Sequence, residues 1–443
     1  MKILQLLILA VWLIVCIGYL PYCIVKRNYN SLKFLTLAII MQNMMSLFAS
    51  NVLPGILSQV IILYKEIILW GAVLYSFICS CKIKKYIMPI FMFMLIIMAY
   101  FFVGEATVYG RLISFRQLMT PIILILYGRT LKLKQEEIKS YFSFIINLGI
   151  VQAFFGILER FVLGDAFWKA INIQKLFETK GFSRWVLSEL PGNYYSYDLY
   201  NIIGVRIRRL VGFSTDPLLT AHYLAFCIVI LLFAGRNFKK MSRIICLGIC
   251  TVACVLTLSK GAILIVGIAY LYKIWLTNKK IAIGLIGIFI IFAVTLIRTN
   301  LFMTVAIHAE GLWSSVSIKS FIGNGIGTAG NLASLNGESS TAGESYFGMV
   351  IGQIGYIGLF VFLYVIYRMI KISLRKYSDT YVYSMVAYII AVILEAAMSE
   401  SAINFVGSGC AFIILGIYSN LKKDKGINAT DHNDIVVVNN EVI

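Results

Sequence analysis

Apolar runs long enough to cross a bilayer core of roughly 30 Å recur from one end of this chain to the other. The runs are continuous and do not alternate with polar residues, so they predict membrane helices and exclude the strands of a membrane barrel. Hydrophobic residues make up 60% of the 443 residues, and charged residues only 13%. Ordinary soluble domains carry about 25% charged residues. We therefore expect an all-α polytopic membrane protein.

The apolar runs predict about 12–13 transmembrane helices. The predicted spans are 3–25, 33–51, 57–79, 86–103, 117–131, 141–163, 217–235, 244–259, 261–276, 281–297, 345–367, 380–398 and 402–420. Two of them are weak, because 57–79 contains Lys65 and Glu66 and 117–131 is short, so a count of 12 stays open beside 13. The expected division of the chain is N-terminal helices 1–163, a first large loop 164–216, helices 217–297, a second large loop 298–344, helices 345–420 and a cytoplasmic tail 421–443.

The net charge of +19 indicates which loops face the cytoplasm, and is not a sign of an acidic binding partner. Most Lys and Arg residues stand in short clusters between apolar runs, as around Lys26, Lys84, Lys132, Lys239 and Lys376. Such clusters mark cytoplasmic loops. They place the C-terminus in the cytoplasm, and a count of 13 spans then places the N-terminus outside. We expect a multi-pass protein of the cytoplasmic membrane with the lipid bilayer as its partner, and no nucleic acid.

All nine cysteines fall inside or at the edge of apolar segments. Free cysteine packs as a small hydrophobic residue, so this placement predicts neither a disulfide framework nor a metal site. No cofactor is expected from the sequence.

The two long loops, 164–216 and 298–344, are predicted to lie on one face, because four predicted spans separate them. Neither loop carries the basic cluster of a cytoplasmic loop, apart from Arg206, Arg208 and Arg209, so both are assigned to the extracytoplasmic side. A charge placed within a span costs about 2.5–3.5 kcal/mol even on the mild insertion scale. Arginines at this place are tolerated if they meet an anion such as pyrophosphate, which the planar guanidinium binds with two hydrogen bonds. The alternative is that they reach toward lipid headgroups.

Aromatic and glycine residues near these arginines add further candidates. Tyr194, Tyr195 and Tyr197 can stack on sugar rings, or can form the aromatic belt of any membrane protein. The second loop matches G-x-G-x-x-G between Gly325 and Gly330. We reject a dinucleotide site there, because the motif requires a preceding strand in a βαβ unit.

Four motifs together resemble the O-antigen polymerase and O-antigen ligase superfamily. They are R-L-V-G-F-S-T-D-P from Arg209, L-T-L-S-K-G-A around Lys260, G-N-G-I-G-T from Gly323, and E-S-Y-F-G-M-V-I-G-Q-I-G-Y-I-G-L from Glu344. The resemblance covers roughly residues 200–365 and the layout with two large outer loops. It implies a GT-C-like, metal-independent, inverting glycosyltransferase that acts on sugars carried by undecaprenyl pyrophosphate. A regulator of chain length is a partner that the family suggests.

The resemblance also implies roles for single residues. Arg209 matches the family arginine and, with Arg206 or Arg208 and Lys260, would bind the donor pyrophosphate. Lys260 departs from the family, which usually carries Arg there. Glu344 would accept the proton of the attacking hydroxyl. It stands where ligases carry a His-Asn pair, which favours a polymerase over a ligase that transfers glycan to lipid A core.

Other residues have plainer interpretations, and other functions stay open. Asp216 followed by Pro217 is typical of a helix start. His222 is expected to be packed or interfacial, whereas Glu395, inside a predicted span, either has a functional role or pairs with a neighbouring helix. A flippase for the same lipid-linked oligosaccharide is the main alternative outside the enzymes, but no internal repeat is visible.

Overall fold

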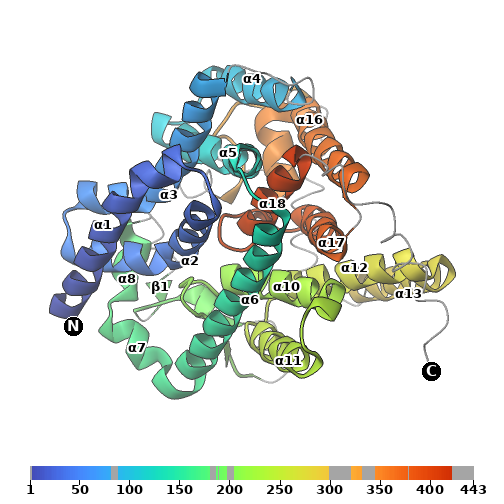
Figure 1. Ribbon diagram of the computed structural model, residues 1–443. Helices are drawn as coiled ribbons and strands as arrows, with labels where there is room; N and C mark the ends of the chain where they lie inside the picture. Colours follow the sequence, from blue (N-terminus) through green and yellow to red (C-terminus); the bar gives the residue numbers. More distant parts are fainter. Residues whose placement is uncertain are drawn as a thin grey trace.

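The computed structural model describes residues 2–80, 88–179, 186–187, 189–196, 204–298, 321–331, 345–377 and 379–421. These residues are mostly helical, and the helices lie side by side over most of the molecule (Figure 1). Each predicted span overlaps one helix. These helices are α1 (Lys2–Val25), α2 (Tyr29–Val52), α3 (Gly55–Ser80), α4 (Met88–Val103), α5 (Val108–Thr130), α6 (Gln135–Leu158), α10 (Pro217–Phe233), α11 (Lys240–Leu256), α12 (Lys260–Thr277), α13 (Lys279–Arg298), α16 (Tyr346–Lys376), α17 (Thr380–Ala396) and α18 (Gly409–Asn420).

Short elements fill the connections. They are the π-helical turn η2 (Glu159–Leu163), the helices α7 (Gly164–Ala170) and α8 (Ile173–Thr179), the 3-10 turns η4 (Gly192–Tyr194), η5 (Gly235–Asn237) and η7 (Glu400–Ala402), and the strands β1 (Val186–Leu187), β2 (Leu190–Pro191), β3 (Tyr195–Ser196) and β4 (Ile207–Arg208). The strands form two antiparallel pairs, β1 with β2 and β3 with β4. The described residues of the first long loop therefore form a small folded layer.

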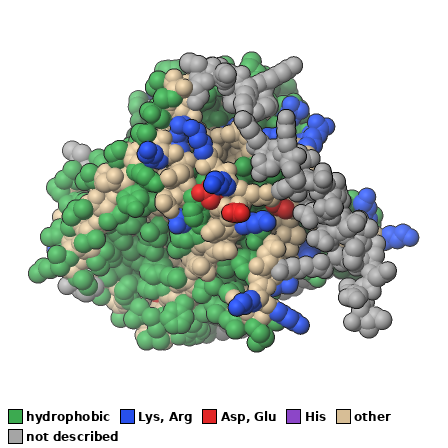
Figure 2. Space-filling model, viewed as in Figure 1, with side chains coloured by type: hydrophobic (Ala, Val, Ile, Leu, Met, Phe, Trp, Pro, Cys, Tyr) green, Lys and Arg blue, Asp and Glu red, His purple; other side chains and the backbone are tan. Residues whose placement is uncertain are grey.

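The length and composition of the helices indicate a multi-pass membrane protein. Among the described residues, five helical segments are long and apolar enough to cross a membrane: Lys2–Val25, Tyr29–Val52, Gln135–Ala170, Lys260–Thr277 and Tyr346–Lys376. Four shorter apolar helices accompany them: α4, α10, α17 and α18. Figure 2 shows hydrophobic side chains around much of the left and lower edge of the molecule, with Asp and Glu toward the middle of this face and Lys and Arg both there and along the right side. Such an outline suits a protein surrounded by lipid.

The helix starts follow from local side-chain chemistry. The Asp216 carboxylate accepts hydrogen bonds from Leu218 N at 2.7 Å and Leu219 N at 3.3 Å, and Pro217 needs no donor. The predicted start of this helix is thus confirmed. Ser259 caps α12 in the same way, through a bond from Ala262 N.

Glycines allow α5 and α18 to pack closely against each other. Figure 1 shows this helix pair in the middle of the molecule. A Cβ atom added to Gly128 would lie 2.0 Å from the carbonyl oxygen of Ile413, and one added to Gly416 would lie 2.1 Å from that of Ile125. Both distances are shorter than any real contact, and both neighbours are backbone atoms that cannot swing away. Small residues that let backbones approach are typical of membrane helix pairs.

We expect Gly128→Ala to lower the free energy of unfolding by about 1–3 kcal/mol, because the methyl group forces α5 and α18 apart. The matched control is Gly267→Ala in α12, where an added Cβ would meet nothing within 4 Å. The control is expected to lose no stability, since alanine is the better helix former. Unfolding in mild-detergent micelles titrated with SDS measures both. Equal stability of Gly128→Ala and wild type would contradict this packing.

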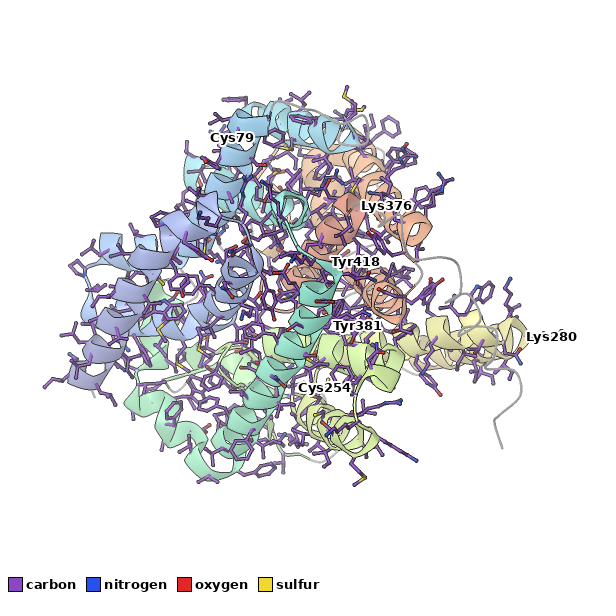
Figure 3. All side chains as sticks on the ribbon, viewed as in Figure 1. Cys79, Cys254, Lys280, Lys376, Tyr381 and Tyr418 are labelled. Atoms are coloured by element: carbon purple, nitrogen blue, oxygen red, sulfur yellow. The ribbon has the colours of Figure 1, made fainter. Side chains whose placement is uncertain are left out.

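The basic clusters around Lys26, Lys132 and Lys376 lie together at one end of the helices. The amide N–H of Lys132, after α5, donates to the carbonyl of Arg27, after α1, at 3.1 Å. Lys376, at the end of α16, donates to the carbonyl of Ser419 at 2.8 Å, and Figure 3 shows it near Tyr418. We call this the basic end.

The long loops lie at the opposite end, which we call the loop end. It is the end at which α10, α12 and α16 begin and α11 and α17 finish. The backbone of Leu210 bonds to the end of α11 at Leu256, and Ser345, at the start of α16, bonds to Ala397 at the end of α17. Residues 321–331 of the second loop pack on α4 and α16 at the same end. The described parts of both loops thus share one face of the protein.

Candidate functional site

A buried carboxylate anchors the first loop to α6. Glu159, in η2, is fully buried and forms an ion pair with Arg208. It also accepts hydrogen bonds from Trp168 Nε1 at 2.5 Å and from Val211 N at 3.2 Å. Asp165 pairs with Arg208 Nε at 2.6 Å from the other side. Burial alone would lower the pKa of Arg208, but the two carboxylates outweigh it and raise this pKa.

This arrangement corrects the predicted role of Arg208. Its guanidinium is bound by two carboxylates of the protein, so it stabilises the loop and is not offered to a pyrophosphate. The sequence did contain a signal for the pair, because Glu159 is an acid inside the predicted span 141–163.

The tyrosines of the first loop occupy different environments. Tyr194 is fully buried and donates to the carbonyl of Thr215 at 3.2 Å, and burial raises its pKa well above its usual value. Its ring therefore cannot stack on a sugar, which corrects that prediction. Tyr195 is partly buried and donates its hydroxyl to Asp165. Tyr197 lies outside the described residues, so its role stays a prediction.

Arg209 is held by backbone carbonyls at the loop end. It is 9% exposed, and its Nε donates to the carbonyl of Thr257 at 2.7 Å. A second guanidinium nitrogen lies 3.4 Å from the carbonyl of Asn193, and the Arg209 amide donates to Tyr194 at 2.8 Å. These carbonyls orient the guanidinium at the loop end. Arg206, by contrast, is exposed.

The turn that holds Arg209 leads directly into α12. Leu210 N donates to Leu256 O at 2.9 Å, so the two predicted motifs run side by side. Leu258 has a φ of 52°, in the left-handed region, which reverses the chain between α11 and α12. Ser259 then caps α12, and the partly buried Lys260 is its first residue. Lys260 and Arg209 are thereby positioned by one short turn.

A buried acid–base pair lies next to the first turn of α12. His222 Nε2 is 3.1 Å from both carboxylate oxygens of Glu395, and His222 Nδ1 is 2.7 Å from the carbonyl of Leu218. A Cβ atom on Gly261 would lie 2.0 Å from Glu395 Oε1, so any larger residue here would require the Glu395 side chain to move. The interpretations of His222 as a packed residue and of Glu395 as the partner of a neighbouring helix are confirmed.

The glycine-rich part of the second loop is seated in a kink of α16. Gly355, in that helix, has a φ of 72°, and the carbonyls of Gly352 and Gln353 instead bind the amides of Asn324 at 2.8 Å and Gly325 at 2.9 Å. A Cβ on Gly325 would lie 2.2 Å from the Cα of Gly104. The glycines allow close backbone packing here.

Glu400 joins this loop to α5. One carboxylate oxygen accepts from Gln117 Nε2 and the other from Asn331 N, both at 2.8 Å. Ser345 caps α16 and donates its hydroxyl to the carbonyl of Ala397 at 2.7 Å. The four predicted motifs thus meet around the end of α17 and η7. Glu344, the predicted base, lies outside the described residues.

Within the described ranges, no group of three or more His, Cys, Asp or Glu side chains could hold a metal ion. Comparisons of the chain with models of protein families, with curated proteins and with solved structures found no match. The resemblance to the O-antigen polymerase and ligase superfamily therefore rests on the four motifs and on the layout of the chain.

Proposed function

We propose that this chain is a GT-C-like glycosyltransferase with about 12–13 membrane spans. It would join oligosaccharide repeat units, carried on undecaprenyl pyrophosphate, into O-antigen or capsular polysaccharide. The basic end would face the cytoplasm, and the loop end the outer face of the bacterial cytoplasmic membrane. The observation that carries the proposal is the position of Arg209, whose guanidinium is oriented by Thr257 in the turn that starts α12.

This position suits the pyrophosphate of a lipid-linked donor. Arg209 supplies a planar fork of donors, and Lys260 supplies a point charge. The first turn of α12 adds the positive end of a helix dipole and its amide N–H groups, which favour anions. These groups bind the growing negative charge on the leaving pyrophosphate as the sugar C1–O bond breaks. Positive groups held in place before the reaction are usually the largest catalytic contribution.

The proton of the attacking hydroxyl requires a base. Glu344 remains our candidate, since the next residue, Ser345, starts α16 beside the end of α17 at the loop end. A general base contributes typically about 10²–10⁴-fold to the rate.

A surface-polysaccharide gel of a deletion strain, with and without the gene, tests the proposal. We expect loss of the polymer ladder while a single repeat unit stays on its acceptor, and restoration of the ladder by the wild-type gene. Loss of every attached unit, with polymer accumulating on the lipid carrier, would instead identify a ligase. Lipid-linked units accumulating on the cytoplasmic face would identify a flippase. An unchanged ladder would contradict all three.

A further inference from the structure

Two buried oxygens without a hydrogen-bond donor lie on neighbouring helices near the loop end. Glu66, on α3, is 6% exposed. Within the described part of the chain, its Oε2 meets no donor, whereas its Oε1 lies 3.0 Å from Lys65 Nζ and 3.9 Å from Arg116 NH1. On α5, the buried Oε1 of Gln117 also lacks a donor among the described residues. Leaving a buried acceptor unmet costs about 1–3 kcal/mol, so a donor from outside the protein is expected here.

Two cations flank the Glu66 carboxylate. Lys65 also lies over the ring of Phe405 with its Nζ 4.6 Å from the centroid, and Arg116 NH1 lies 3.9 Å from Glu66 Oε1. The Arg116 side chain is 40% exposed, so the group reaches the surface at this residue. Ionisable residues inside a membrane segment are costly and are functional by default.

The group is connected to the candidate site through Glu400. Gln117 Nε2 donates to the Glu400 carboxylate at 2.8 Å. Glu395 packs against the start of α12, and Glu400 lies five residues further along the chain. Five residues span at most ~18 Å even when extended. An oligosaccharide bound at Lys260 and Arg209 has several rings and can reach this distance.

The charges decide which ligand fits. A phosphate would be repelled by Glu66, and a metal ion would be repelled by Lys65 and Arg116. Sugar hydroxyls carry both a donor for the unmet oxygens and an acceptor for the guanidinium. We propose that Glu66, Gln117 and Arg116 form a subsite that binds hydroxyl groups of the lipid-linked oligosaccharide. The inference rests on the proposed function and adds a sugar-binding subsite separate from the pyrophosphate-binding cations.

Binding of the sugar without pyrophosphate tests the subsite directly. The probe is the oligosaccharide released by mild acid from the lipid-linked fraction of the parental strain and tritium-labelled at its reducing end. Full-length protein in lipid nanodiscs is titrated with this probe. We expect Glu66→Gln to weaken binding by roughly ten- to a hundredfold, since hydrogen bonds to charged groups are the strong ones. Arg116→Lys, at a half-exposed position that tolerates change, is expected to weaken binding by about fivefold or more.

Two control variants test whether a loss of sugar binding is specific to the proposed subsite. Lys169→Ala removes an exposed cation of the first loop, outside the proposed sites, and is expected to bind the released sugar as wild type does. Asp379→Asn removes another buried carboxylate with an unmet oxygen, at the basic end, and is expected to leave binding unchanged. Wild-type affinity in both Glu66→Gln and Arg116→Lys, or no binding to wild type, would mean that water meets these oxygens and would overturn the subsite. The polymer ladder in the deletion strain tests the proposed function independently.

Discussion

Glu159→Ala is expected to lower the free energy of unfolding by about 3–5 kcal/mol, since it breaks a buried ion pair and leaves two buried N–H donors without their acceptor. The substitution leaves the guanidinium of Arg208 with one carboxylate instead of two. It also removes the acceptor for Trp168 Nε1 and for Val211 N. The first loop loses one of its attachments next to α6, while the hydrogen bond from Gln152 to Ser214 and the stacking of Phe155 on Phe213 remain. Unfolding in detergent micelles titrated with SDS measures the loss of stability.

The matched control removes an exposed ion pair from the same loop. Lys169, on α7, lies 3.3 Å from Glu189, and both side chains are well exposed. Lys169→Ala is expected to cost less than about 1 kcal/mol, as is usual for surface pairs. In a double-mutant cycle, Glu159→Ala combined with Arg208→Ala should cost less than the sum of the two single changes. Additive losses would show that the pair contributes nothing as a pair.

Arg209→Ala is expected to reduce the initial rate of glycosyl transfer by roughly 10²–10³-fold, the usual effect of removing one donor that stabilises the transition state. Arg209→Lys keeps the charge but loses the second donor, so an intermediate loss of about tenfold is expected. Transfer from the lipid-linked repeat unit, measured with full-length protein in nanodiscs, gives both rates.

Two controls distinguish a loss of catalysis from a loss of folding. Arg209 contributes a hydrogen bond to the turn at Thr257, so the unfolding midpoint of each variant has to be measured alongside the rate. Lys169→Ala, an exposed cation of the same loop, should transfer as wild type does. If Arg209→Ala and Arg209→Lys both transfer at the wild-type rate, the pyrophosphate role of Arg209 is wrong.

The helices were predictable because few backbone conformations are stable in a lipid bilayer. A backbone in a bilayer has to satisfy its own hydrogen bonds, so long apolar runs become helices with little influence from distant residues. The start of α10 was predictable for a similarly local reason, since the Asp216 side chain reaches the amides two and three residues ahead. Even the weak run 57–79 became the helix α3.

The partners of charged residues were not predictable, because they depend on distant contacts. Arg208 and Arg209 are neighbours in one motif, yet one is bound by two carboxylates and the other by carbonyls. The difference arises where β4 ends, since successive side chains of a strand point to opposite sides. Tyr194 and Tyr195 differ in burial for the same kind of reason.

The most direct measurement is polymer formation by the purified chain alone. Full-length protein in nanodiscs is mixed with the lipid-linked repeat unit isolated from the deletion strain, with no other protein. We predict products that differ in length by whole repeat units, still attached to the lipid carrier, with wild type and not with Arg209→Ala. Unchanged repeat units after prolonged incubation with folded wild-type protein would contradict the proposal that this chain joins them.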